Sequence, residues 1–256
     1  MEGVASLPLY LTILLYMKQA FGYTKNMKIK LCSFFLKEGI MHIIPVIHHI
    51  TNELTFLNAD ICHKNNTFGV MLISMTGDNE NLSSLAKIIK GRYPNLKVGI
   101  NLLGVSALNS LDESLTFGLD MTWSDNPIIT SDYISDDAYL IKEKISKNEH
   151  LFFNSVAFKY QKLDNNPAKA AQNSKEFTFI PTTSGLATGV SADLTKVKSM
   201  KESIADYPLA LASGLTPNNI KDYLPYISYG LVSTGISSSF HELDSTLTAQ
   251  LMQNSL

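Results

Sequence analysis

Residues 208–237 read PLALASGLTPNNIKDYLPYISYGLVSTGIS and contain two short apolar runs, each followed by a turn of small and hydroxyl-bearing residues. The first run leads into Ser213-Gly214-Leu215 and the second into Ser233-Thr234-Gly235. Short, near-continuous apolar runs bounded by turn residues are typical of parallel strands that are buried on both faces. The stretch therefore predicts two successive strand–helix units, with a glycine turn after each strand.

The same alternation is repeated from Met41 to the end of the chain. Polar segments with helical spacing, at residues 51–65, 80–93, 136–148, 192–207 and 242–253, separate the apolar runs. An open doubly wound sheet would have a glycine-rich turn after its first strand, but residues 48–53 read HHITNE. The pattern therefore predicts an α/β fold, a single compact (β/α)8 TIM barrel over residues 41–256. Its eight predicted strands are residues 43–47, 68–74, 97–103, 119–124, 151–158, 177–182, 208–213 and 229–234.

The first forty residues differ from the rest and are predicted to be an N-terminal extension. Residues 4–17 form an uncharged, mostly apolar run, shorter than the roughly 20 residues of a spanning helix. A signal peptide would have a Lys or Arg before this run, and none is present. An unstructured appendage or a mis-set start is the favoured interpretation. Contact of residues 4–17 with a membrane and a helix packed on the barrel are the alternatives.

Composition restricts the classes of partner. The net charge is −2 and no basic stripe is present, so a nucleic acid is not expected. Cys32 and Cys62 have no metal-binding spacing, and no cluster of histidines and carboxylates is apparent. We therefore expect a cytoplasmic protein with reduced thiols, no metal and no cofactor. Association with further copies of the chain is left open.

Polar residues stand at the end of every predicted strand, whereas the strand interiors are apolar. In a TIM barrel the functional site lies at these carboxyl ends and the loops that follow them. Side chains at these positions are therefore predicted to bind a substrate: Ser74, Asn101, Trp123, Gln161, Thr182, Thr183 and Ser184.

The two glycine turns are predicted to bind one phosphate group. A phosphate needs several N–H donors with no bulky side chain in the way, and barrels commonly supply them from the loops after strands 7 and 8. Residues 183–189 (TSGLATG) follow strand 6 and are placed to cover the same ligand, while Thr216-Pro217 predicts the start of the next helix. The phosphate-binding residues are therefore Ser213, Gly214, Leu215, Ser233, Thr234 and Gly235.

Four residues at strand ends are candidates for catalysis. His48 and His49 are neighbours, so one is expected to face the barrel mouth and the other the helices. Asp125 is the best carboxylate for acid–base work, with a turn-forming role as the alternative. Lys159 is predicted to supply a charge for a phosphate or carboxylate. A Schiff-base aldolase that acts through Lys159 is a minor alternative.

These motifs resemble two groups of phosphate-binding barrels. SGLTPNNI followed by LVSTGIS is similar to the turn after strand 7 of phosphoribosylanthranilate isomerase. PVIHHI, VGINLL and TTSGLATG resemble more closely the BtpA/SgcQ group, over residues 45–244. The resemblance implies a ribulose-phosphate-binding type of barrel. The isomerase has a cysteine base at the end of strand 1, where this chain has His48 or His49, so that reaction is not implied.

Two functions follow as expectations. The first is a metal-independent enzyme that acts on a small phosphorylated metabolite, such as a sugar phosphate or ribosyl phosphate, by isomerase, lyase or glycosyl-transfer chemistry. The second is a non-catalytic, BtpA-like assembly or regulatory barrel that keeps the phosphate pocket. Loss of turnover with intact binding after substitution of Asp125 would distinguish the first from the second.

Overall fold

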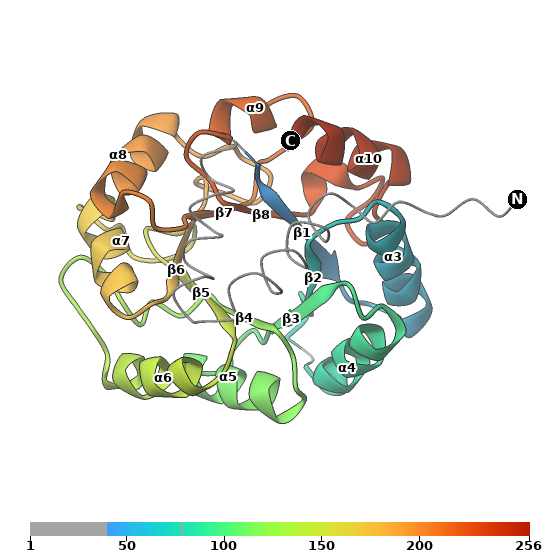
Figure 1. Ribbon diagram of the computed structural model, residues 1–256, viewed down its shortest axis with the longest axis horizontal. Helices are drawn as coiled ribbons and strands as arrows, with labels where there is room; N and C mark the ends of the chain where they lie inside the picture. The colour runs from blue at the N-terminus through green and yellow to red at the C-terminus, as the bar shows by residue number, and fades with distance from the viewer. Residues whose placement is uncertain (1–39, 78) are drawn as a thin grey trace, which may run out of the picture.

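The structure is a computed structural model that describes residues 40–77 and 79–256 of the 256-residue chain. Eight parallel strands close into one barrel in sequence order, and β1 pairs with both β2 and β8 (Figure 1). This order confirms the predicted (β/α)8 barrel and excludes an open sheet. The strands are β1 (His42–His48), β2 (Gly69–Ile73), β3 (Lys97–Asn101), β4 (Met121–Ser124), β5 (Leu151–Ser155), β6 (Ile180–Thr183), β7 (Ala210–Ala212) and β8 (Tyr229–Val232).

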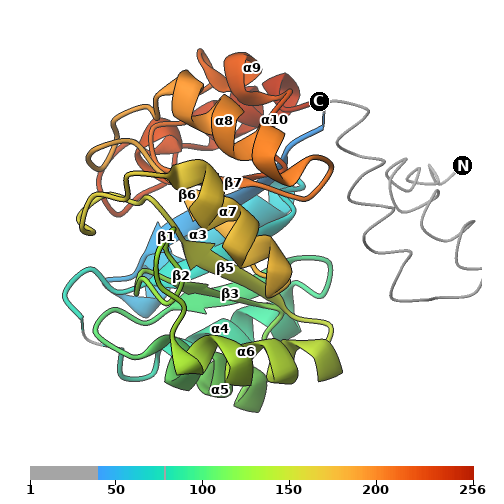
Figure 2. The same ribbon diagram turned by 90° about the vertical axis from the view of Figure 1, so that its left-hand side faces the viewer.

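Helices alternate with the strands and form a ring outside the barrel (Figures 1 and 2). Each segment predicted to be helical contains a helix, and two further helices, α5 and α7, follow β3 and β5. The ring consists of α3 (Asn52–Lys64), α4 (Leu82–Arg92), α5 (Ala107–Thr116), α6 (Asp136–Lys147), α7 (Pro167–Glu176), α8 (Leu194–Ile204), α9 (Ile220–Tyr223) and α10 (Ser245–Asn254), with the 3-10 helix η1 (Thr234–Ile236) after β8.

The helix after β7 starts less regularly than Thr216-Pro217 predicts. Residues 217–219 form a turn, and the regular helix α9 begins at Ile220. The backbone N–H of Thr216 donates to Oδ1 of Asn219 at 2.8 Å, and the N–H of Asn219 donates to the Thr216 hydroxyl at 3.3 Å. These reciprocal bonds form a capping box with Thr216 as the N-cap, and the backbone N–H of Ile220 donates to the Thr216 carbonyl at 3.1 Å. The predicted cap is therefore present, and α9 continues from the turn that it closes.

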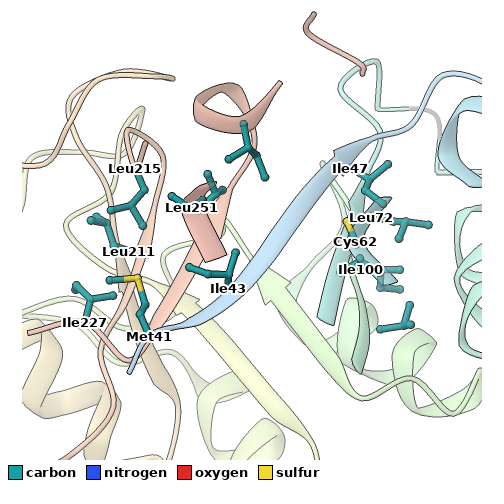
Figure 3. Close-up of a cluster of buried hydrophobic side chains, with 14 of the residues drawn as sticks. Met41, Ile43, Ile47, Cys62, Leu72, Ile100, Leu211, Leu215, Ile227 and Leu251 are labelled. Atoms are coloured by element: carbon teal, nitrogen blue, oxygen red, sulfur yellow. The ribbon is translucent and has the colours of Figure 1, made fainter. Parts of the chain in front are cut away.

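Side chains on the two faces of each strand belong to different apolar layers. Ile44 and Val46 of β1 lie in the barrel interior with residues of the other strands. Ile43 and Ile47 lie in the outer layer, between the strands and the helices, as Figure 3 shows. The same layer contains Cys62, a buried free thiol. Because side chains alternate between the two faces of a strand, His48, the last residue of β1, is on the same face as Ile44 and Val46.

Met41 already belongs to the barrel. Its side chain is buried in the outer layer, and its backbone N–H donates to the carbonyl of Ser255 at 2.9 Å, which joins the two ends of the barrel. The predicted extension, with its apolar run at residues 4–17 and Cys32, lies outside the described residues apart from Ile40, so that division of the chain stays a prediction. No helix in the described part is long and apolar enough to cross a membrane.

Candidate active site

The carboxyl ends of the strands meet at one rim because the strands run parallel around the closed barrel. All residues predicted from the sequence to contact a ligand lie at this rim. They occupy the last two positions of a strand or the loop that follows it. The side-chain contacts decide which of them can act together.

β1 directs its two consecutive histidines to opposite sides. His48 continues the inward face that contains Ile44 and Val46. Nδ1 of His49 lies 2.8 Å from the hydroxyl oxygen of Thr55, in α3 of the outer ring. The structure therefore brings His48, and not His49, into the barrel mouth. A catalytic role for His49 stays an untested prediction, with its ring turned toward the helices.

The contacts of His48 fix its proton. Nδ1 lies 2.8 Å from the carbonyl oxygen of Phe240, in the loop that precedes α10. A carbonyl oxygen only accepts, so Nδ1 carries the hydrogen and the neutral ring has its lone pair on Nε2. Burial lowers the pKa of His48, as do the neighbouring His241 and Lys159, while the Phe240 carbonyl opposes them. A neutral imidazole is suited to accept a proton from a substrate.

Asp125 directly follows β4 and has two differently placed carboxylate oxygens. Oδ1 accepts hydrogen bonds from Nδ2 of Asn101 at 3.2 Å and from the hydroxyl of Ser155 at 3.5 Å. No group among the described residues bonds to Oδ2. Burial raises the pKa of Asp125, and the Asn101 bond, the Lys159 charge and the Ser155 bond act against this rise. One oxygen is thus oriented, and the other is available to exchange a proton.

Two predicted substrate-binding residues support this carboxylate. The indole N–H of Trp123 donates to the Ser155 hydroxyl at 3.0 Å, and its ring meets the edge of Phe158. The side-chain amide of Gln161 donates to the backbone carbonyl of Asp125 at 2.8 Å. Trp123 and Gln161 therefore position Ser155 and Asp125, and their direct contact with a ligand stays a prediction.

Lys159 connects the carboxylate side of the mouth with the glycine turns. Its Nζ donates to the hydroxyl of Ser213 at 2.7 Å and to that of Thr188 at 3.2 Å. Burial lowers the pKa of the ammonium group, whereas the charges of Asp125 and Tyr160 raise it. The lysine therefore places its positive charge beside the loop after β7, and it also interacts with the negative charge of Asp125.

The remaining predicted substrate-binding residues are engaged with the protein. The buried hydroxyls of Thr182 and Thr183 donate to backbone carbonyls at 3.1 and 3.2 Å. Ser74 pairs with a neighbouring threonine hydroxyl at 3.1 Å. The Ser184 hydroxyl accepts the backbone N–H of Lys159 at 2.8 Å. Ser184 thus fixes the loop that carries the lysine, and ligand contacts of these four residues stay predictions.

The loops after β6, β7 and β8 pack closely together. Ser213 and Gly214 are consecutive left-handed residues, with φ of 81° and 75°. A side chain at Gly214 would collide with the backbone of Val190 in the loop after β6, and one at Gly235 would collide with the Leu215 carbonyl. Glycine at these positions allows three loops to meet beside the Ser213 hydroxyl.

Several backbone N–H groups in these loops form no hydrogen bond with an acceptor in the described part of the chain. Successive N–H groups that point into one concavity form a site for an anion. The side chain of Leu215 is buried in the outer layer, so this residue can contribute only its backbone. Ser233 opens the last turn, where its carbonyl accepts the backbone N–H of Ile236 at 2.9 Å. Within residues 40–77 and 79–256, no acceptor bonds to the N–H groups of Gly214, Leu215, Thr234 and Gly235.

Sequence reasoning missed three residues in or next to this site. Ser155 connects Trp123 with Asp125, and His241 donates from Nδ1 to the backbone carbonyl of His48 at 3.1 Å. Lys196 of α8 donates to the Ser184 carbonyl at 2.6 Å. Thr188, which accepts a hydrogen bond from the Lys159 ammonium group, lies in the loop of residues 183–189 that was predicted to cover the ligand. Ser155 closes the inward face of β5, so strand alternation could have identified it. His241 and Lys196 depend on contacts with residues distant in the sequence, which no local pattern records.

No three His, Cys, Asp or Glu side chains in the described part of the chain gather as a metal site would require. The contacts described above define the candidate site. It consists of His48, Asn101, Asp125, Ser155 and Lys159 at the mouth, with the turns after β7 and β8 beside them. The arrangement offers a base, a carboxylic acid group, a cation and backbone N–H groups that bond to no acceptor among the described residues.

Comparison with known proteins finds similarity in fold alone. No protein-family model matches the sequence, and no curated protein matches it. Phosphoribosylanthranilate isomerase from Thermotoga maritima is similar in structure, with a TM-score of 0.60 at 14% identity over 84% of this chain and 98% of that chain. The predicted resemblance to this isomerase is therefore confirmed for the fold. The resemblance to the BtpA/SgcQ group stays a prediction.

Other solved barrels are similar to the same degree. KGPDC from Streptococcus mutans has a TM-score of 0.60 at 12% identity, over 84% of this chain and 97% of that chain. The YdjI aldolase from Escherichia coli K12 has a TM-score of 0.55 at 12% identity, over 89% and 93%. At such identities the likeness shows a shared (β/α)8 fold.

Proposed function

We propose that the protein is an enzyme that acts on a small phosphorylated metabolite, such as a sugar phosphate or ribosyl phosphate. The observation that carries the proposal is the set of unoccupied N–H groups in the turns after β7 and β8, next to the Lys159 ammonium group on Ser213. An anion placed there would accept bonds from Gly214 and Gly235 and approach the lysine charge.

The mouth supplies groups for proton transfer next to this phosphate site. In an isomerisation, Nε2 of His48 would take a proton from a substrate carbon or hydroxyl, and Asp125 in its acid form would donate one to the other reacting atom. The reverse assignment of the two groups uses the same geometry. One proton is removed and one is returned, so the reaction needs no external oxidant or reductant. Lys159 would stabilise the negative charge that develops on a substrate oxygen.

The fold neighbours support this proposal by analogy. A phosphoribosylanthranilate isomerase has been solved in complex with a reduced 1-(o-carboxyphenylamino)-1-deoxyribulose 5-phosphate, and it matches this chain with a TM-score of 0.59 at 14% identity. A barrel of this shape therefore holds a phosphorylated sugar derivative in that protein. The reaction of that isomerase is not part of the proposal, because a histidine ends β1 in this chain.

A panel of phosphorylated metabolites tests the proposal on the full chain. A ligand at about 100 times its Kd adds roughly 2.7 kcal/mol of stability, which corresponds to a rise of several degrees in melting temperature. Phosphosugars should give this rise and their unphosphorylated forms should not. The best binder should then be turned over, and Asp125→Asn should abolish turnover while leaving binding intact.

The alternative is a regulatory or assembly barrel that binds the phosphorylated ligand without reaction. It predicts the same thermal shifts but no turnover of any binder by the wild-type protein. Absence of a shift with every phosphorylated compound, inorganic phosphate included, would contradict both functions.

A further inference from the structure

A cavity of about 260 Å³ lies beside the mouth, outside the acid–base group and the glycine turns. It is enclosed by the loop after β5, the start of the loop after β6, and Lys196 of α8. Pockets that hold drug-sized molecules measure roughly 300–1,000 Å³. The cavity is therefore of a size for a small ligand with about one ring.

The charges around the cavity are mainly positive. Lys159, Lys162 and Lys196 line it, together with a single carboxylate, Asp164. Both carboxylate oxygens of Asp164 accept hydrogen bonds, one from the backbone N–H of Ser131 and one from that of Asn166, each at 2.9 Å. No carboxylate forms an ion pair with Lys162 among the described residues. The lining thus carries an uncompensated positive charge, which favours an anion.

The walls of the cavity are apolar and unusually exposed. Leu163 and Leu186 are 79% and 85% exposed, and Tyr160 is 79% exposed. Phe158 closes the inner side, where its ring also meets the only tryptophan of the chain, Trp123. Isolated exposed apolar residues are ordinary, but three around one cationic cavity form a surface that gains by contact with an apolar group.

Burial strengthens the need for a counter-charge. It lowers the pKa of Lys159 and of Lys196, so both ammonium groups are partly deprived of water. Nζ of Lys196 donates to the carbonyls of Ala157 and Ser184, at 3.2 and 2.6 Å, which are neutral acceptors. The charges of Asp125 and Asp193 act on Lys159 and Lys196 respectively, but neither forms an ion pair with them among the described residues. A carboxylate in the cavity would supply a negative charge in direct contact.

We propose that this cavity is a second binding site, distinct from the phosphate loops, for a small apolar carboxylate such as an aromatic acid. The apolar body would lie against Phe158, Leu163 and Leu186, and the carboxylate would face Lys162 and Lys196. Lys159 borders both sites, since it lines the cavity and bonds to Ser213. The proposal does not depend on the reaction proposed above.

Benzoate is the probe, titrated into the full chain by calorimetry, with Trp123 emission as a second readout because its ring meets Phe158. Benzyl alcohol lacks the charge and acetate lacks the apolar body, so each should bind at least several-fold more weakly. Lys162→Gln should raise the benzoate Kd about two- to fivefold, the range of an exposed ion pair. Leu186→Ser should also raise it, through loss of apolar contact.

Matched controls are available on α6, on another part of the ring. Lys142→Gln and Leu140→Ser make the same changes at exposed residues and should leave the benzoate Kd unchanged. Saturable binding of benzoate that weakens in the two cavity variants alone supports the site. No saturable binding by either readout, or equal affinities in all four variants, overturns it. Benzoate binding in a protein that fails to bind inorganic phosphate would retain this site and reject the proposed function.

Discussion

Nζ of Lys159 lies 2.7 Å from the hydroxyl oxygen of Ser213, which joins the loop after β5 to the loop after β7. The same lysine interacts with the charge of Asp125, which follows β4. A single cation therefore borders both the proposed phosphate site and the proposed acid–base group. This arrangement makes Lys159 the residue whose substitution should affect phosphate binding most strongly.

Lys159→Gln should weaken the binding of inorganic phosphate about tenfold or more. A hydrogen bond to a charged group contributes about 1.5–3 kcal/mol, and about 1.4 kcal/mol corresponds to a factor of ten in Kd. Glutamine retains a donor for Ser213 but removes the charge. Calorimetric titration of the wild type and the variant measures the change.

Lys142→Gln is the matched control for this substitution, because Lys142 lies on α6 and donates to a backbone carbonyl. Its phosphate affinity should equal that of the wild type. Equal weakening in both variants would indicate a general effect of protein charge and would contradict a specific role for Lys159.

Gly235→Ala should destabilise the protein and weaken phosphate binding. The added methyl group would meet the Leu215 carbonyl, and forcing an atom into a packed site costs about 1–3 kcal/mol. Urea denaturation measures the free energy of unfolding. Gly91→Ala, on α4, meets no atom within 4 Å and should instead raise stability by about 0.5–1 kcal/mol, as alanine does in a helix. Similar effects of the two substitutions would show that the close approach at Gly235 is unimportant.

Asp125→Asn should abolish turnover and stabilise the protein near neutral pH. Burial raises the folded-state pKa of Asp125 above its unfolded value, so the folded protein binds the proton more tightly. The contribution of this group to stability is therefore present at low pH and is lost as pH rises through the folded pKa. Asparagine still accepts the bonds from Asn101 and Ser155 without the buried charge.

Denaturant unfolding of the wild type and Asp125→Asn, at a series of pH values from about 4 upward, measures the difference in their free energies of unfolding. The stability advantage of the variant should grow as pH rises from about 4, near the ordinary pKa of an aspartate, through the folded pKa. A variant that becomes relatively less stable over the same interval would show that the carboxylate is stabilised in the fold, contrary to this account.

Borohydride treatment in the presence of aldehydes and ketones should give no covalent adduct on Lys159. Its ammonium group already donates to two hydroxyls, which suits a fixed positive charge. Intact-mass analysis, with peptide mapping of any product, detects such adducts. A borohydride-trapped adduct at Lys159 that phosphorylated carbonyl compounds increase would support the aldolase alternative and reject the lysine's role as a charge.

The barrel was predictable because its strands are buried on both faces and appear as near-continuous apolar runs, such as residues 151–158. Strand period predicted that only one of His48 and His49 faces the mouth, and the structure identifies that residue as His48. The capped turn before α9 was predictable from Thr216-Pro217, whereas the regular part of the helix begins only at Ile220. The contact of His241 with His48 joins residues 193 positions apart, a distance that no local pattern spans.

The central claim is that the turns after β7 and β8 bind a phosphate group through their backbone N–H groups. Amide resonances in a ¹⁵N-labelled full-length protein, titrated with inorganic phosphate, test it most directly. The account predicts saturable shifts at Gly214, Thr234 and Gly235, which are weakened in Lys159→Gln. Saturating phosphate that leaves these three resonances unmoved, or that shifts only residues elsewhere, would contradict it.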